Sequence, residues 1–316
     1  MHGAPIDGTS SAMRLLVEPE FDGRRLDHFL VARVPHMSRA RAKRFVAEGW
    51  VRVNGRRARK ARLLRTGDLV SLQRTPPPVD FAARPSGAVT LTVLYEDAHC
   101  VVVDKPAGVP THPLRPDETG TVASALVHRY PEMASVGYRR REPGILHRLD
   151  TGTSGVLLAA RTAAAFETLR ALLRAGRIDK RYQLLCDGHA PAPEVVSFPL
   201  ARRDAQRVRA CRDAAEAARL GGQDARTELV RATPVGPYSF VEARASSARR
   251  HQVRVHLAAI GHPLLGDLLY GGPAVAGLER HALHASSLAF EAPWASVEVA
   301  APLAADLAAI LAREPR

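Results

Sequence analysis

The sequence has few cysteines, few aromatic residues and no long apolar run. Its three cysteines, Cys100, Cys186 and Cys211, lie far apart and have neither a disulfide spacing nor a zinc-binding spacing. This excludes a disulfide-stabilised scaffold and favours a reducing compartment. No stretch approaches the ~18 apolar residues of a membrane span, and the start, MHGAPIDGTSSAM, lacks the basic region and apolar core of a signal peptide. We therefore expect a cytoplasmic protein.

Acidic residues are also in the minority, because 45 Lys and Arg residues stand against 32 Asp and Glu residues and give a formal net charge of +13. The excess is concentrated in the segment 24–74, which holds fifteen basic residues and three acidic ones. Such a balance indicates a polyanionic partner, either nucleic acid or an acidic membrane surface. The chain of 316 residues is long enough for two domains, and we expect the basic segment to be one of them.

The basic segment has the hydrophobic pattern of a folded domain. A first helix is predicted from apolar residues at helical spacing, namely Leu26, Phe29, Leu30 and Val34. Ser38 can cap a second helix, RARAKRFVAEG, whose exposed surface is mostly cationic and which ends at Gly49. The pair Asn54-Gly55 after WVRV predicts a hairpin, and TGDLVSL supplies a last strand.

This segment resembles the S-four-like RNA-binding domain, also called the αL fold. The resemblance rests on SRARAKRFVAEGWVRVNG, on Lys60 and on TGDLV. Aromatic residues are scarce here, so phosphate and shape readout are favoured over base stacking. We predict an RNA-binding domain at 14–75, followed by a proline-rich linker at 76–90. Its predicted RNA contacts are Arg39, Arg41, Lys43, Arg44, Arg52 and Lys60.

The remaining region, 91–316, is predicted to contain more strands than helices and more hairpins than β-α-β crossovers. Strands are expected in LTVLYE, CVVVDK, VLLAA and KRYQLLCDG, with a hairpin formed by ELVRATP and YSFVEARAS. Helices are expected in TVASALVHRY, in AAAFETLRALLRAG after the capping Thr162, and in RHQVRVHLAAIG. Residues 201–226 are expected to form a mobile surface insertion. The predicted fold class is α+β, with a mixed, largely antiparallel sheet and a catalytic cleft, plus the small α/β domain at the N-terminus.

The segment HRLDTGTSG, residues 147–155, places an aspartate among small turn-forming residues. A solvated turn would use the same residue types, so this segment indicates a function only when it is taken together with other motifs of the chain. In order along the chain these are DKPAGVPTHP, KRYQLLCDG, RRHQVRVHLAAIGHPLLGDLLYGG and RHALHASSLAF. Together with HRLDTGTSG they resemble the pseudouridine synthases of the RluA type, over almost the whole stretch from Leu91 to Pro293.

The resemblance implies an antiparallel sheet split by a cleft, with a uridine in RNA as substrate and its carbon-linked isomer as product. It implies no organic cofactor and no metal. It also implies that Asp150 is the nucleophilic or essential carboxylate, Tyr182 the active-site tyrosine and Arg254 the basic partner of the aspartate. Arg148 would occupy the space left by a flipped base, and His147 is counted with it as a substrate-binding residue.

Elementary chemistry is consistent with these roles. Breaking the bond between ribose and base builds positive charge at the anomeric carbon, which a fixed carboxylate can stabilise or attack. Asp150 must therefore be ionised, and a neighbouring guanidinium would counter the rise in its pKa that burial causes. A base in folded RNA must also leave its stack, at a cost of a few kcal/mol that basic contacts elsewhere can offset.

Several alternatives stay open at this point. A glycosidase would need the same carboxylate but would release uracil, and a non-catalytic RNA-binding or ribosome-assembly factor would need only the basic surface. Large-subunit ribosomal RNA is the favoured substrate because of the appended basic domain, and transfer RNA is the alternative. Ala248 stands where the family usually has glycine. We expect a monomer with no membrane partner, and histidines that are structural or face RNA.

Overall fold

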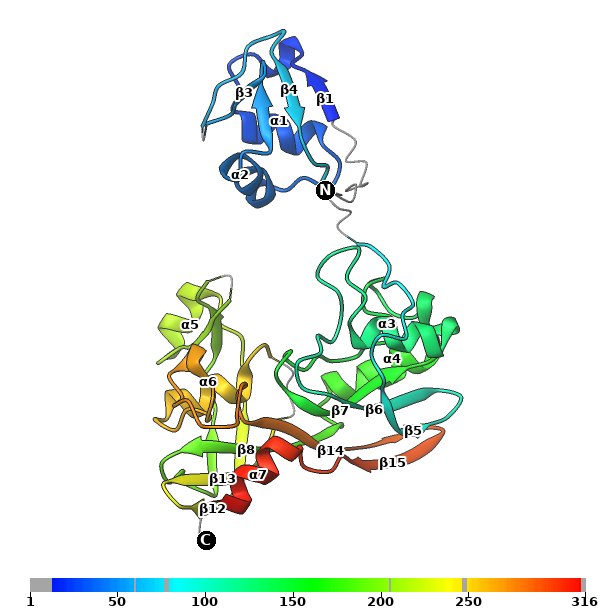
Figure 1. The fold of residues 1–316 in the computed structure, drawn as a ribbon, viewed down its shortest axis with the longest axis vertical. Helices are drawn as coiled ribbons and strands as arrows, with labels where there is room; N and C mark the ends of the chain where they lie inside the picture. The colour runs from blue at the N-terminus through cyan, green and yellow to red at the C-terminus, as the bar shows by residue number, and fades with distance from the viewer. Residues whose placement is uncertain (1–12, 60, 77–79, 205, 246–248, 314–316) are drawn as a thin grey trace, which may run out of the picture. The chain divides into compact units, whose positions relative to one another are not determined.

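A computed structural model describes residues 13–59, 61–76, 80–204, 206–245 and 249–313. The chain divides into two compact units, Met1–Phe81 and Ala82–Arg316 (Figure 1). The division falls inside the predicted linker 76–90. The backbone N–H groups of Ala83 and Ser86 already donate to the carbonyls of Arg140 and Ser124, so the end of that segment belongs to the second unit.

The first unit is a four-stranded antiparallel sheet with two helices. The sheet order is β1-β4-β2-β3, formed by Met13–Leu16, Leu69–Leu72, Val51–Val53 and Arg56–Arg57. A 3-10 turn at Pro19–Phe21 precedes α1 (Leu26–Arg33) and α2 (Arg39–Ala47). As predicted, the Ser38 hydroxyl accepts a hydrogen bond from the N–H of Arg41 at the start of α2. Asn54 and Gly55 both have positive φ, which the tight β2–β3 hairpin requires.

The second unit is built on one nine-stranded sheet. Its order is β5-β6-β7-β14-β8-β13-β12-β9, and β15 pairs with β14. All pairs are antiparallel except β7 with β14. The predicted mixed, largely antiparallel α+β fold is therefore confirmed. The first five strands are β5 (Thr92–Glu96), β6 (Cys100–Lys105), β7 (Ser154–Ala160), β8 (Asp179–Asp187) and β9 (Glu194–Val196). The other four are β12 (Thr227–Val235), β13 (Tyr238–Arg244), β14 (Leu283–Ala292) and β15 (Ala295–Ala300).

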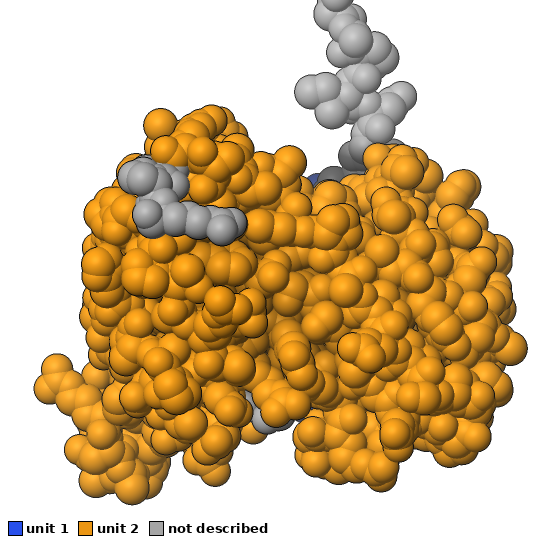
Figure 2. Space-filling model, turned by 90° about the horizontal axis from the view of Figure 1, so that it is seen from below, with its two compact units in different colours: residues 1–81 blue, residues 82–316 orange. Residues whose placement is uncertain are grey.

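Helices cover the two halves of this sheet. On the half formed by β5, β6 and β7 lie α3 (Val122–Arg129), a 3-10 turn at Pro131–Ser135 and α4 (Ala163–Arg174) (Figure 1). On the other half lie α6 (Gln252–Ala259) and α7 (Ala305–Arg313), with a 3-10 turn at Leu268–Tyr270. In the space-filling view the side chains of this unit pack into one continuous body (Figure 2). None of the helices in the described residues is long and apolar enough to cross a membrane.

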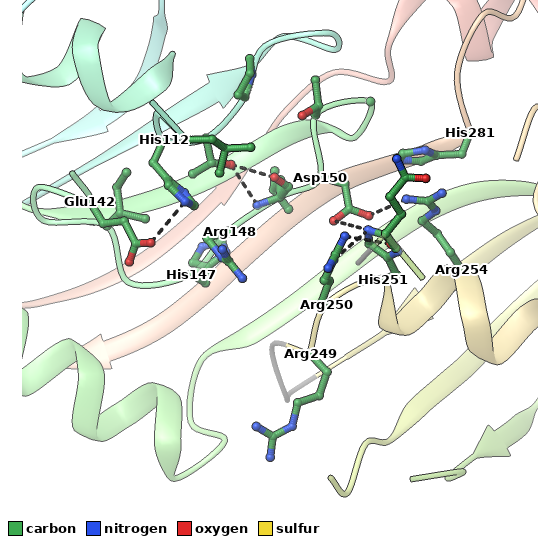
Figure 3. Close-up of a pocket in the computed structure, with 18 of the residues that line it drawn as sticks. His112, Glu142, His147, Arg148, Asp150, Arg249, Arg250, His251, Arg254 and His281 are labelled. Carbon is green, nitrogen blue, oxygen red and sulfur yellow. Dashed lines mark hydrogen bonds and ion pairs between the residues drawn. The ribbon is translucent and has the colours of Figure 1, made fainter. Parts of the chain in front are cut away.

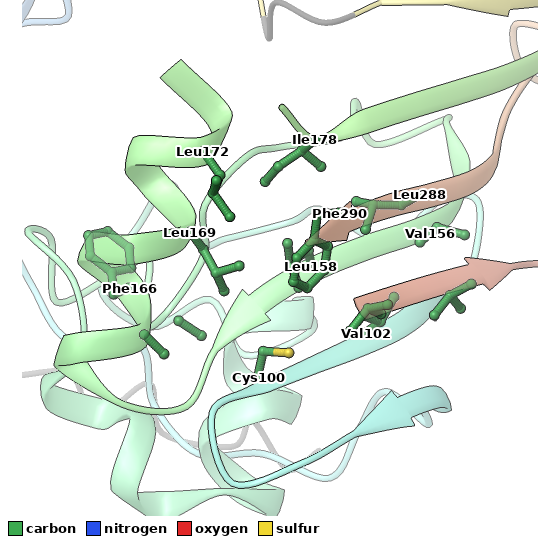
Figure 4. Packing of buried hydrophobic residues seen from close by; sticks show 14 of the residues in the cluster. Cys100, Val102, Val156, Leu158, Phe166, Leu169, Leu172, Ile178, Leu288 and Phe290 are labelled. Carbon is green, nitrogen blue, oxygen red and sulfur yellow. The ribbon is translucent and has the colours of Figure 1, made fainter. Parts of the chain in front are cut away.

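The core under α4 shows how the local sequence pattern builds the first half. Phe166, Leu169 and Leu172 recur on one face of α4, and they pack on alternate residues of the central strands (Figure 4). Fully burying one such side chain contributes about 1.5–3 kcal/mol. Thr162 caps the helix by accepting from the N–H of Ala165, as predicted. This packing fixes β7, the strand that begins at Ser154 within HRLDTGTSG.

Residues 201–226, which were predicted to be a mobile surface insertion, contain regular secondary structure in their described part. They include β11 (Val208–Ala210), which pairs with β10 (Leu200–Arg202), and α5 (Ala214–Leu220). Their polar composition gives little sign of this structure, because hydrogen bonds hold it together with only a small apolar cluster that includes Val208 and Ala225. Asp213 caps α5 by accepting from the N–H of Glu216, and the Tyr270 hydroxyl accepts from the N–H of Val208.

Gly155 lies where β7 meets both β6 and β14, and no other residue fits there. Its φ is +108°, and a Cβ added to it would lie 2.1 Å from the carbonyl oxygen of Ala285. We expect Gly155→Ala to lower the free energy of unfolding by about 3 kcal/mol or more, because both backbone strain and a backbone clash oppose it.

The matched control is Gly108→Ala, since Gly108 has a φ of +83° but no atom within 4 Å of the added Cβ. That variant should lose only about 1 kcal/mol. Urea unfolding of the full chain compares the two, and equal losses would contradict the steric argument.

Candidate active site

A cleft of about 790 Å³ in the second unit is lined by most of the predicted catalytic and substrate-binding residues. Its lining comes from three segments, 110–114, 142–152 and 249–254, and from the single residues Gln206, Leu269 and His281. Asp150 lies between two groups of polar side chains, one around His112 and Glu142 and the other around Arg254 (Figure 3). Tyr182 lines a smaller adjoining pocket of about 50 Å³ that also includes Asp150. The structure thus brings Asp150, Tyr182 and Arg254 together.

The backbone on both sides of Asp150 is held by hydrogen bonds. The Thr111 hydroxyl donates to the carbonyl of Leu149 at 2.7 Å and accepts from its N–H at 3.2 Å. The Asp150 carbonyl accepts from the N–H of Thr153, which closes the turn that leads into β7. The carboxylate itself remains about a quarter exposed, with 24% of its side-chain surface accessible. A rigid loop therefore presents a reachable carboxylate to the cleft.

Lys105 also holds the backbone of this loop in place. Its ammonium is fully buried and donates to three carbonyl oxygens, those of Pro106, Val109 and Thr151. Burial lowers its pKa to about 7. Sequence reasoning assigned this lysine no role, although a charged residue at the end of the apolar run CVVVDK was a signal that the strand ends in a specific polar contact.

Arg254 joins two carboxylates. One edge of its guanidinium binds Asp267 through Nε and Nη2, both at 2.7 Å, and Nη1 donates to Asp150 Oδ2 at 2.9 Å. Arg254 and Asp267 are 7% and 1% exposed, and the Tyr270 ring lies 5.1 Å from the guanidinium carbon. Sequence reasoning missed Asp267, because nothing in HPLLGDLLYGG distinguishes it from a turn aspartate.

The charge around Asp150 keeps it ionised. Burial alone would raise the pKa of its carboxyl, but Arg254 and, in the acidic range where the carboxyl titrates, the protonated forms of His251 and His281 outweigh burial and hold the pKa below its usual range. His251 Nε2 lies 3.8 Å from Asp150 Oδ1, and its Nδ1 shares a hydrogen bond with the Tyr270 hydroxyl. The pocket therefore favours a carboxylate over a carboxylic acid at neutral pH.

Two histidines near the site are neutral because they are buried. Burial lowers the pKa of His147 to about 3 and that of His281 to about 4. His147 Nε2 accepts from the N–H of Leu158, and His281 Nε2 shares a hydrogen bond with the Thr153 hydroxyl. The first contact ties the Asp150 loop to β7, and the second ties it to the segment just before β14. The substrate-binding role of His147 stays a prediction.

Tyr182 and Arg148 both line the small pocket that includes Asp150. Tyr182 is half-buried on β8, opposite Ala285 of β14, and burial next to Asp150 raises its pKa to about 12. Its phenol is therefore protonated at neutral pH. Arg148 is exposed and lies toward His112 and Glu142 (Figure 3). Among the described residues its guanidinium makes no hydrogen bond or ion pair.

One further lysine in the small pocket was not anticipated. Lys180 is 3% exposed, lines the pocket with Asp150 and Tyr182, and its ammonium finds no hydrogen-bond partner in the described part of the chain. Burial lowers its pKa to about 8. Within the described residues, no three His, Cys, Asp or Glu side chains are grouped so that they could hold a metal ion.

The predicted RNA contacts of the first unit lie on α2 and β2, except Lys60, which lies outside the described residues, as does Ala248 of the second unit. Arg41 and Arg52 each donate to a nearby carbonyl, of His36 and Gly55 respectively. The four α2 cations, Arg39, Arg41, Lys43 and Arg44, stand against one acidic residue of the adjoining turn, Glu48, whose carboxylate lies 3.8 Å from Arg44. This surface is positively charged and exposed.

Comparisons with known proteins agree with this geometry. A family model described as RNA pseudouridylate synthase matches residues 99–259, and one described as S4 domain matches residues 24–70. The chain is 37% identical to an "Uncharacterized RNA pseudouridine synthase" of Chloroflexus aurantiacus, over 94% of this chain and 92% of that protein. It is 33% identical to "Ribosomal large subunit pseudouridine synthase D" of Xanthomonas campestris pv. campestris, over 96% and 92%. Among solved structures, "Human RNA Pseudouridylate Synthase Domain Containing 1" is similar, with a TM-score of 0.54, 28% identity and coverage of 72% and 90%.

Removing the guanidinium of Arg254 tests the electrostatic part of the site. In Arg254→Met two carboxylates lose their shared partner, so we expect the free energy of unfolding at pH 7 to fall by about 3–5 kcal/mol. The pKa of Asp150 should rise, because burial is no longer offset, and ¹³C NMR of the labelled carboxyl measures this.

The sign of the pH dependence follows from that shift. In the wild type the depressed pKa of Asp150 contributes stability that is present above the unfolded pKa and lost as the pH falls. In Arg254→Met the pKa of Asp150 should lie above its unfolded value, so ionisation of Asp150 destabilises the folded state as the pH rises. The loss of unfolding free energy relative to the wild type should therefore be smaller at pH 5 than at pH 7. The control Arg254→Lys keeps the charge, and an equal rise in the Asp150 pKa in both variants would contradict the account.

Proposed function

Because this chain belongs to the RNA pseudouridylate synthase family, whose members are isomerases, we propose that it converts uridine to pseudouridine in large-subunit ribosomal RNA and that Asp150 is the essential carboxylate. The observation that carries the proposal is the contact between Arg254 and Asp150, which places an ionised and partly exposed carboxylate at the cleft. The named substrate rests on relatives called "Ribosomal large subunit pseudouridine synthase D" in Xanthomonas campestris pv. campestris and Xylella fastidiosa.

The reaction requires one bond to break and another to form between the same two fragments. As the N1–C1′ bond breaks, C1′ becomes electron-poor, and Asp150 either attacks it or stabilises its charge. The freed uracil turns over and C5 bonds to C1′, which breaks the bond to Asp150 if Asp150 has attacked C1′. The proton on C5 leaves and N1 gains a proton, so the product is an isomer of the substrate. Atoms balance without water or a cofactor. Arg254 holds Asp150 ionised and fixed through these steps, while its own position is set by Asp267.

In this proposal Tyr182 and Arg148 contact the RNA substrate and take no part in breaking or forming bonds. The raised pKa of Tyr182 makes its phenol a poor base at neutral pH, so its ring packs against the bound uracil. Arg148 occupies the space that the flipped base leaves in the RNA, because its guanidinium is exposed and the residue lies two positions before Asp150 in the sequence. Base flipping costs a few kcal/mol, which contacts elsewhere must offset.

The first unit supplies such contacts. Its match to the S4 domain model and the exposed cations of α2 support RNA-phosphate binding. Transfer RNA remains the alternative substrate, and a glycosidase that releases uracil is the alternative reaction. The non-catalytic reading is disfavoured, because the chain belongs to a family of enzymes and retains Asp150, Tyr182 and Arg254.

Mapping pseudouridine in cells tests the substrate and the residue together. RNA from cells with the protein, without it and with only Asp150→Asn is treated with carbodiimide, and reverse-transcription stops are compared. We expect stops at one or a few large-subunit ribosomal uridines that vanish in both the deletion and the variant.

Each other outcome has a defined meaning. Stops that vanish only from transfer RNA would replace the ribosomal substrate by the alternative. Abasic sites in place of pseudouridine would indicate the glycosidase. If Asp150→Asn kept every stop, Asp150 would not be the essential carboxylate.

The contribution of α2 is measured by RNA affinity at several salt concentrations. In the full chain, Arg39→Ala/Lys43→Ala should reduce the salt slope of ribosomal RNA binding by about one for each phosphate that the variant no longer neutralises. The control Arg14→Ala/Arg65→Ala removes the same charge from exposed positions of the first unit outside α2. Equal effects of the two double variants would show that net charge, and not the α2 surface, governs binding.

A further inference from the structure

A second basic groove lies beside the cleft, over α4 and the segment 138–148. Its volume is about 490 Å³. Apolar side chains form its floor, including Phe166 and Leu173 of α4. Four arginines surround it, and we call it the arginine groove after them: Arg139, Arg148, Arg170 and Arg174. Apart from Arg148, its residues take no part in the proposed reaction.

The charge of the arginine groove is largely uncompensated. Arg139 lies 3.4 Å from Glu142, which also pairs with His112. Arg148, Arg170 and Arg174 form no ion pair with any carboxylate among the described residues. Exposed arginines are common on protein surfaces and usually only solvated, but here they converge on one depression instead of spreading over a face. Such convergence favours a polyanion, because each guanidinium can bind a phosphate in bidentate fashion.

Tyr138 adds an aromatic surface to the groove. It is 60% exposed, unusually so for a large ring. The guanidinium carbon of Arg170 lies 4.1 Å from its ring centre, Phe166 meets it edge-on at 5.3 Å, and its hydroxyl donates to Glu167. A ring held by three contacts and still open to solvent is a surface on which a nucleobase can stack at little entropic cost.

The groove is continuous with the cleft. Four residues line both, namely Glu142, Ile145, Leu146 and Arg148. Arg148 therefore marks the passage from the site around Asp150 to the groove over α4. A nucleic acid strand whose uridine reaches Asp150 can continue past Arg148 without leaving the positively charged surface.

We propose that the arginine groove binds the RNA strand that flanks the target uridine, with Arg170 and Arg174 on its phosphates and Tyr138 against one of its bases. The proposal rests on the proposed function, and it adds a second RNA contact, within the catalytic unit itself. It predicts that the groove acts on substrate binding and leaves the chemical step unchanged.

Steady-state kinetics of the purified full chain separate these effects. The substrate is large-subunit ribosomal RNA from cells that lack the protein, and pseudouridine formation is followed. Arg170→Ala/Arg174→Ala should raise KM about tenfold or more while kcat stays within twofold. The control Arg177→Ala/Arg231→Ala removes two exposed arginines outside the groove and should change KM less than twofold.

Tethered radical probing locates the RNA directly and needs no turnover. All three native cysteines are buried, so Arg174→Cys provides one accessible attachment point for an iron chelate, and Arg231→Cys provides the control. We expect cleavage within a few nucleotides of the target on one flank from position 174 and none there from position 231.

The outcomes distinguish the two proposals. If the wild type forms no pseudouridine in this RNA, the ribosomal function fails, and the cleavage pattern still decides whether RNA occupies the groove. If the wild type is active but the groove variant matches the control in KM, or loses kcat alone, the groove proposal is overturned. The same holds if positions 174 and 231 give the same cleavage pattern.

Discussion

The ion bridge from Asp267 through Arg254 to Asp150 is the interaction on which the candidate active site depends. Its three members come from different elements: Asp150 from the turn before β7, Arg254 from α6 and Asp267 from the turn before the 3-10 segment Leu268–Tyr270. A buried guanidinium with only one carboxylate partner would leave part of its hydrogen-bonding capacity unused. The bidentate contact with Asp267 fixes the plane of the guanidinium. The remaining Nη1 can then hold Asp150 through one hydrogen bond, which leaves part of the hydrogen-bonding capacity of this carboxylate unused.

The rest of the site serves this bridge. Lys105 and Thr111 fix the backbone beside Asp150, and Gly155 lets β7 pass close to β14 just after the turn. These contacts restrict the conformational freedom of the loop, which an ordinary surface turn would keep. In return the loop holds one carboxylate at a set position, which is the condition for stabilising charge that develops only at one carbon atom.

Local parts of the fold followed from the sequence, whereas long-range parts of the site did not. Ser38 and Thr162 cap helices as their positions predict, and Asn54-Gly55 makes the expected hairpin. Asp150 and Arg254, by contrast, are 104 residues apart, and only family resemblance paired them. Asp267 and Lys105 were missed because their roles depend on burial by distant segments. The secondary structure of residues 201–226 was missed because hydrogen bonds and a small apolar cluster, which leave no hydrophobic period in the sequence, hold them.

The most direct test of the account is tritium release from ribosomal RNA labelled at C5 of uridine, with the purified chain and its Asp150→Asn variant. Isomerisation must expel the C5 hydrogen while the base stays attached to the RNA. The account predicts release of tritium into water by the wild type, with no free uracil, and no release by the variant. Release by Asp150→Asn at the wild-type rate, or tritium that leaves the RNA as free uracil, would contradict it.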